Sequence, residues 1–128
     1  KDGPHSEIVG RDLPYIAERD SRLPEALKRL ISNSGLYDWT VYAIGQIGGL
    51  LRDVEEKYGN ISAKVTGGLL TLLDHPDNQH YLGAFLHAAK GKRPYLSTEQ
   101  AVQCLEGLAG TTGARVKAVL RSYSIGVK

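Results

Sequence analysis

The chain has 128 residues, of which 41% are hydrophobic and 23% charged, and its formal net charge is +2. This length and balance are ordinary for a soluble globular chain and predict one domain with its own apolar core. No apolar run approaches the ~18 residues that span a bilayer, and the single cysteine, Cys104, excludes an internal disulfide and a cysteine-rich zinc site. An intracellular, by default cytoplasmic, location is therefore expected.

The first 20 residues show no sustained apolar period and contain two prolines and two glycines. Both residue types interrupt regular structure. We therefore predict an extended N-terminal arm over residues 1–20, apart from a short turn near residues 15–19. Residues 21–128 are predicted to form a single helical domain.

Apolar spacing and capping residues predict the helices of that domain. The first predicted helix has Pro24 in its first turn and ends at Ser34-Gly35, and the second runs from about Leu36 or Asp38 to Tyr58. The third lies between Ser62 and His75-Pro76, and the fourth runs from Asp77 to about Lys90. The fifth opens with a Ser97/Gln100 capping box, and the sixth follows Gly113. No segment shows the alternation of a strand. The predicted fold class is all-α, a compact bundle of five to six short helices with an extended N-terminal arm.

Three glycines, Gly45, Gly48 and Gly49, lie inside the predicted second helix, where each costs about 1 kcal/mol relative to alanine. They fall opposite the apolar stripe that faces the core. A strip without side chains lets another backbone approach closely, so we predict close helix packing there, with Gly67-Gly68 as the candidate facing surface. A groove for an external partner and a hinge are the alternatives.

The histidines and the cysteine, which could support catalysis or metal binding, lie at spacings that do not predict a catalytic or metal site. His80 and His87 are seven residues apart, about 10.5 Å along a helix axis, which is too far for two ligands of one ion. Cys104 lies at helical spacing among apolar residues and is predicted to be a small buried hydrophobe. The chain has no nucleophile elbow, P-loop or dinucleotide-binding glycine pattern. We expect no enzyme activity, no metal site, no cofactor and no small-molecule substrate.

Charge is distributed unevenly along the chain. Residues 1–77 hold 12 acidic and 9 basic side chains, whereas residues 78–128 hold 2 acidic and 7 basic ones. In the second half, KGKRPY forms a basic loop with an aromatic residue next to it, and further cations lie on the exposed sides of the predicted sixth helix. Such cations can neutralise phosphates. Three interpretations stay open: a solvated basic face, an RNA- or DNA-binding surface, and a contact for an acidic protein.

The expected function is that of a non-catalytic interaction domain of a larger or multi-subunit protein, which binds a protein partner or associates with itself. The alternative is a nucleic-acid-binding domain, for RNA more than DNA, that uses the basic second half. No membrane contact is expected. The residues predicted to bind the partner or the nucleic acid are Arg52, Lys90, Lys92, Arg93, Arg115, Lys117 and Arg121.

Overall fold

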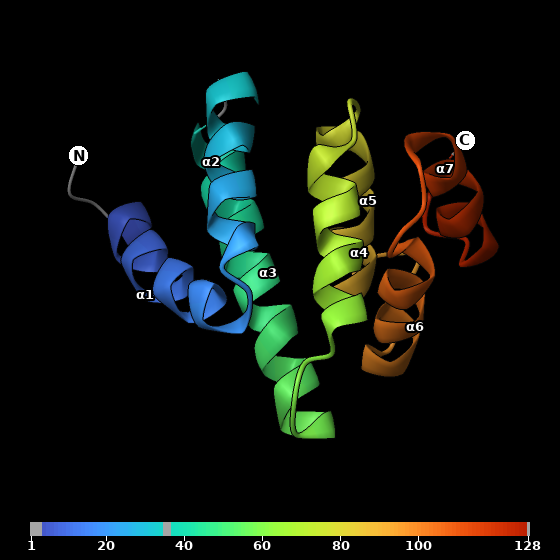
Figure 1. The fold of residues 1–128 in the computed structure, drawn as a ribbon, viewed down its shortest axis with the longest axis horizontal. Coiled ribbons are helices and arrows are strands. Elements are labelled where there is room, and N and C mark those ends of the chain that lie inside the picture. Colours follow the sequence, from blue (N-terminus) through green and yellow to red (C-terminus); the bar gives the residue numbers. More distant parts are fainter. Residues whose placement is uncertain (1–3, 35–36, 128) are drawn as a thin grey trace.

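The computed structural model describes residues 4–34 and 37–127, and these ranges contain seven α-helices (Figure 1). Their bounds are α1 Pro4–Arg19, α2 Arg22–Ser34, α3 Tyr37–Tyr58, α4 Ala63–Asp74, α5 Asn78–Ala89, α6 Thr98–Leu108 and α7 Gly113–Ser122. The predicted all-α class is confirmed. The described residues form seven helices, instead of the predicted five to six.

The six predicted helices appear as α2 to α7, and local signals place their ends. The Ser62 hydroxyl accepts a hydrogen bond from the Val65 N–H at 3.2 Å and so caps α4. The capping box of Ser97 and Gln100 at the start of α6 is complete. Gly59, with a φ of +84°, follows the last residue of α3. A start of α3 at Leu36 would lie outside the described residues.

The predicted extended arm is wrong over Pro4–Arg19, which form α1. Pro14 lies inside this helix, although an interior proline ordinarily costs about 3 kcal/mol. Packing outweighs this cost, because α1 lies along α3 and contacts α2. Ile16 is fully buried in the common core, and Leu13 and Tyr15 pack against it. Tertiary contacts, which local sequence signals do not reveal, therefore make this segment helical.

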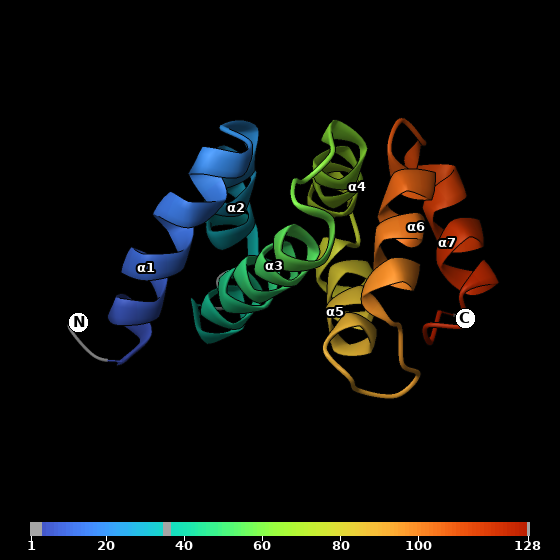
Figure 2. The same ribbon diagram turned by 90° about the horizontal axis from the view of Figure 1, so that it is seen from below.

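The long helix α3 occupies the middle of the molecule, with α1 and α2 on one side and α4 to α7 on the other (Figures 1 and 2). It packs against α1, α2, α5 and α6. Because neighbours lie on both sides, Val41 is buried in α3 as well as Ala43 and Ile47. No helix in the described ranges has both the length and the apolar character that crossing a membrane requires.

The turn between α1 and α2 is held by the carboxylate of Asp20. Its oxygens accept hydrogen bonds from the Arg22 backbone N–H at 2.9 Å and from the Arg22 guanidinium at 3.0 and 2.6 Å. The Asp20 side chain is only 12% exposed. The hydrogen bonds from Arg22 are the main reason that the pKa of Asp20 falls from 3.8 to about 2.

Asp20→Asn is expected to lower the free energy of unfolding by about 1–2 kcal/mol at pH 7, because it removes the charge that Arg22 binds. The folded-state pKa lies below the unfolded value, so this contribution is present above pH 4 and disappears as the pH falls through 2. Urea titrations between pH 7 and pH 2 measure it. Asp77→Asn is the control, since the Asp77 side chain makes no capping bond to α5. Equal stability of both variants at pH 7 would contradict the prediction.

Candidate interaction surface

The loop between α5 and α6 is fastened at both ends to the last turn of α5. Gly91, with a φ of +87°, turns the chain out of the helix. The Lys92 N–H then donates to the His87 carbonyl at 2.7 Å, and the Leu96 N–H donates to the Ala88 carbonyl at 2.9 Å. The Leu96 side chain is buried, with 6% exposure. The segment between these two attachments is therefore tied to α5 at both ends.

Within this segment the side chains of Lys92, Arg93 and Tyr95 face solvent. Tyr95 is 61% exposed, more than the other large exposed hydrophobic residue of the described surface, Tyr58, at 43%. An isolated exposed apolar side chain is common on protein surfaces. Here the exposed ring lies beside two cations in a loop whose ends are fixed, which is a combination suited to binding.

The exposed side of α7 carries the other predicted cations. Lys117 and Arg121 are one turn apart and share a face, whereas Arg115 lies at the opposite edge of the exposed side. The buried face of α7 packs mainly against α6 and α4 through Val116 and Leu120. No acidic residue follows Glu106 in the sequence, so no carboxylate of α7 itself neutralises these cations.

The path of the chain brings part of α7 to the same end as the loop. α7 runs back along α6, so its C-terminal half points toward the end at which the α5–α6 loop lies (Figure 2). Arg121 belongs to this C-terminal half of α7, and Arg115, six residues earlier, lies about 9 Å back along the helix axis. We call Lys92, Arg93, Tyr95, Arg115, Lys117 and Arg121 the basic surface. Glu99 lies in the first turn of α6, directly after the loop.

The structure places two of the predicted binding residues elsewhere, in ion pairs within the chain. Arg52 Nη2 lies 2.8 Å from Asp12 Oδ1, and the Asp12 side chain is only 4% exposed. Lys90 Nζ lies 3.3 Å from Asp53 Oδ2. These two cations are thus occupied by carboxylates of α1 and α3.

The glycines of α3 make room for the same two charged groups. A Cβ on Gly48 would lie 3.2 Å from the Asp12 carboxylate, and one on Gly49 would lie 3.1 Å from Lys90 Nζ. The neighbour of Gly48 is therefore α1, and not the helix of Gly67 and Gly68 as the sequence suggested. Gly45 is half-buried in the same helix.

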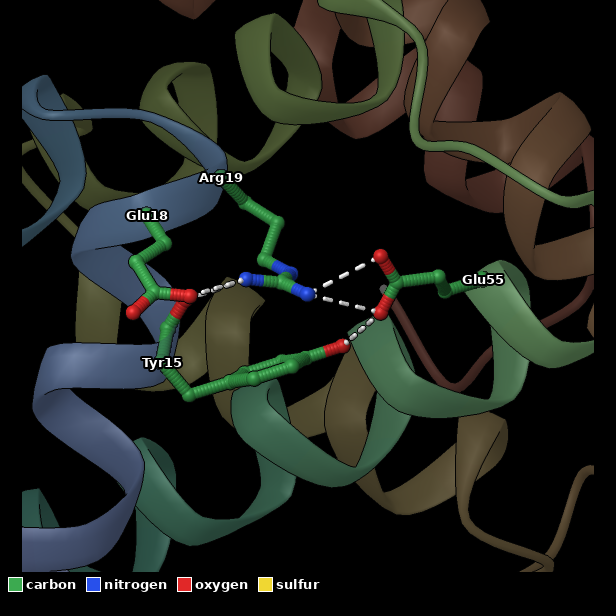
Figure 3. A network of polar contacts seen from close by, with 4 residues as sticks. All are labelled: Tyr15, Glu18, Arg19 and Glu55. Atoms are coloured by element: carbon green, nitrogen blue, oxygen red, sulfur yellow. Dashed lines mark hydrogen bonds and ion pairs between the residues drawn. The ribbon is translucent and has the colours of Figure 1, made fainter.

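A polar network joins the end of α1 to α3 (Figure 3). The Tyr15 hydroxyl donates to Glu55 at 2.6 Å, and Arg19 donates to both Glu55 oxygens at 2.9 Å. The Arg19 guanidinium also lies 3.7 Å from the centre of the Tyr15 ring. The hydrogen bonds from Tyr15 and then Arg19 lower the pKa of Glu55, and burial together with the bond to Glu55 raises the pKa of Tyr15. Both groups keep their ordinary charge near pH 7, and the network fastens α1.

His75 and Cys104 occupy structural positions. His75 caps the end of α4: its Nδ1 accepts from the Asp77 N–H at 2.9 Å, so its Nε2 donates to the Gly113 carbonyl at 3.2 Å. Cys104 is fully buried, and burial raises the pKa of its thiol to about 12, which leaves it unreactive at neutral pH. Over the described residues, no group of three or more His, Cys, Asp or Glu side chains is placed to hold a metal ion.

Two features of the predicted binding residues and their surroundings could not be assigned from the sequence. Tyr95 was noted only as the aromatic residue beside the basic pair, and nothing local shows that its ring stays outside the core. The counterion of Arg52 was missed completely, because Asp12 lies in a segment without a helical pattern, 40 residues away. Comparison of the chain with known protein families, with curated proteins and with solved structures finds no match.

Proposed function

We propose that this chain is a non-catalytic interaction domain that binds a polyanionic partner through the basic surface. One observation carries the proposal: the α5–α6 loop and α7 together carry five exposed cations that make no ion pair within the described residues. Residues 78–127 contain only two carboxylates, those of Glu99 and Glu106. Like charges gathered without counterions attract an anionic partner.

The ion pairs elsewhere in the molecule support the choice of this surface. All six recorded pairs include a carboxylate from residues 12–74, and Lys90 is the one member that comes from the C-terminal half. The glycine strip of α3 has no part in the proposal, because Asp12 and Lys90 lie against Gly48 and Gly49. A partner would meet the basic surface without first displacing an internal contact.

The triple variant Arg93→Glu/Lys117→Glu/Arg121→Glu is expected to bind a polyanion at least about tenfold more weakly than the wild type at 50 mM salt. For three phosphate contacts, wild-type affinity for a single strand should fall about 20-fold between 50 and 200 mM salt, and the variant should lose most of this dependence. Fluorescence anisotropy with labelled poly-glutamate and a labelled 12-nucleotide RNA measures both quantities.

The matched control is Lys28→Glu/Lys57→Glu/Lys64→Glu, which changes the net charge by the same amount at three exposed lysines of α2, α3 and α4. It should bind within about twofold of the wild type if the basic surface is the site. An equal loss in both triple variants would show a net-charge effect and refute the proposed site. Absence of binding to both probes at 50 mM salt would refute the proposed function.

A further inference from the structure

Resting on this proposed function, we infer that the polyanion is a single-stranded nucleic acid and that the ring of Tyr95 is a platform on which one of its bases stacks. The juxtaposition that carries the inference is a 61% exposed tyrosine immediately after two exposed cations in a loop fastened at both ends. Proteins that bind single strands combine cations that follow the backbone with aromatic rings that stack on bases.

The attachment of the loop favours stacking. The bonds of Lys92 to His87 and of Leu96 to Ala88 hold the backbone on both sides of Tyr95, and the buried Leu96 side chain anchors the segment. Less conformational freedom of the loop then remains to be lost when a ligand binds. The exposed Tyr95 ring, in a loop attached to α5 on both sides, is available to stack on a planar ligand group.

The placement of charge fits a phosphate chain that continues past the stacked base. Lys92 and Arg93 precede the tyrosine in the loop. The C-terminal half of α7, which carries Arg121, points toward the end of the molecule at which this loop lies (Figure 2). Phosphates next to a base bound to Tyr95 would therefore find the two cations of the loop. None of Lys92, Arg93 and Arg121 makes an ion pair within the described residues, which leaves their charge available.

The exposed ring of Tyr95 favours a single-stranded nucleic acid over a duplex or an acidic peptide. In a duplex the bases stack on one another, and their faces are accessible only in loops and at ends. An acidic peptide would use the cations of the basic surface, and its carboxylates gain nothing from an exposed ring. Removing the ring should therefore affect single strands with bases and leave the other polyanions unaffected.

The test compares Tyr95→Ala, Tyr95→Phe and, as matched control, Tyr58→Ala at the second exposed tyrosine. The probes are a labelled 12-nucleotide RNA, an abasic strand with the same number of phosphates, and labelled poly-glutamate. We expect Tyr95→Ala to weaken RNA binding about tenfold, Tyr95→Phe to stay within about twofold because it keeps the ring, and Tyr58→Ala to match the wild type. Binding of the abasic strand and of poly-glutamate should be the same in all four proteins.

Two results would overturn the inference. One is RNA binding by Tyr95→Ala as tight as that of the wild type, and the other is wild-type binding of the abasic strand as tight as that of the RNA. Either result, with salt-sensitive binding intact, would leave the proposed function standing and show that the polyanion binds through its charges without a base stacked on Tyr95. Failure of every probe to bind would instead refute the proposed function itself, so the two failures are distinguishable.

Discussion

Gly68→Ala is expected to lower the free energy of unfolding by about 3 kcal/mol or more, the largest single-residue effect we predict. Gly68 lies in α4 where α6 approaches most closely. A Cβ at this position would overlap the carbonyl oxygen of Leu105 and lie 2.6 Å from its carbonyl carbon and 2.8 Å from its Cα. Because these are backbone atoms, which no change of rotamer can move aside, α6 must shift relative to α4 to admit the methyl group.

The neighbouring Gly67→Ala provides the control in the same helix. Its Cβ would meet the Ala109 side chain at 3.3 Å, a contact that a small shift can relieve. Alanine also gains about 1 kcal/mol of helix propensity at either site. Urea denaturation followed by circular dichroism should therefore place Gly67→Ala within about 1 kcal/mol of the wild type. If Gly68→Ala proved as stable as Gly67→Ala, the close approach of α4 and α6 would be wrong.

Arg52→Ala is expected to destabilise the fold by about 2–3 kcal/mol. The change removes the counterion of Asp12, whose carboxylate is nearly buried between α1 and α3. It also removes the guanidinium that lies 4.4 Å from the centre of the Tyr15 ring. The estimate stays below the range for fully buried pairs, because the Arg52 side chain is 41% exposed and water screens part of the interaction.

The matched variant is Arg115→Ala, an equal truncation at an exposed arginine of α7 without an ion pair among the described residues. It should change stability by less than about 0.5 kcal/mol. Adding Asp12→Asn to Arg52→Ala should recover part of the loss, since it removes the unpaired buried charge. Equal stabilities of Arg52→Ala and Arg115→Ala in urea denaturation would contradict this account and return Arg52 to the candidate binding residues.

The sequence by itself determined helices α2 to α7, because their ends depend on short-range chemistry. The Ser62 cap and the Ser97/Gln100 capping box satisfy backbone groups within three residues of themselves. Gly59 ends α3 through a backbone conformation that glycine adopts without strain. The burial of Cys104 also follows from local apolar spacing.

Tertiary structure alone decided that Pro4–Arg19 form a helix. Pro14 weakens the local preference, and the segment gains its stability from Ile16 in the common core and from Arg19 and Tyr15 bound to Glu55. All these contacts join residues that are far apart in the sequence. No local pattern can indicate them.

The same distinction applies to the candidate site. Composition and spacing identified the cations of the C-terminal half, and the structure then separated Arg52 and Lys90 from Arg93 and the rest of the basic surface. The reason is physical: the sequence around a helical cation is the same kind of pattern whether its side chain faces solvent or a carboxylate of a distant segment. The partner of Arg52 is 40 residues away and reaches it only because α1 docks on α3. The sequence gives the number and position of the cations, but the fold decides which of them a carboxylate neutralises.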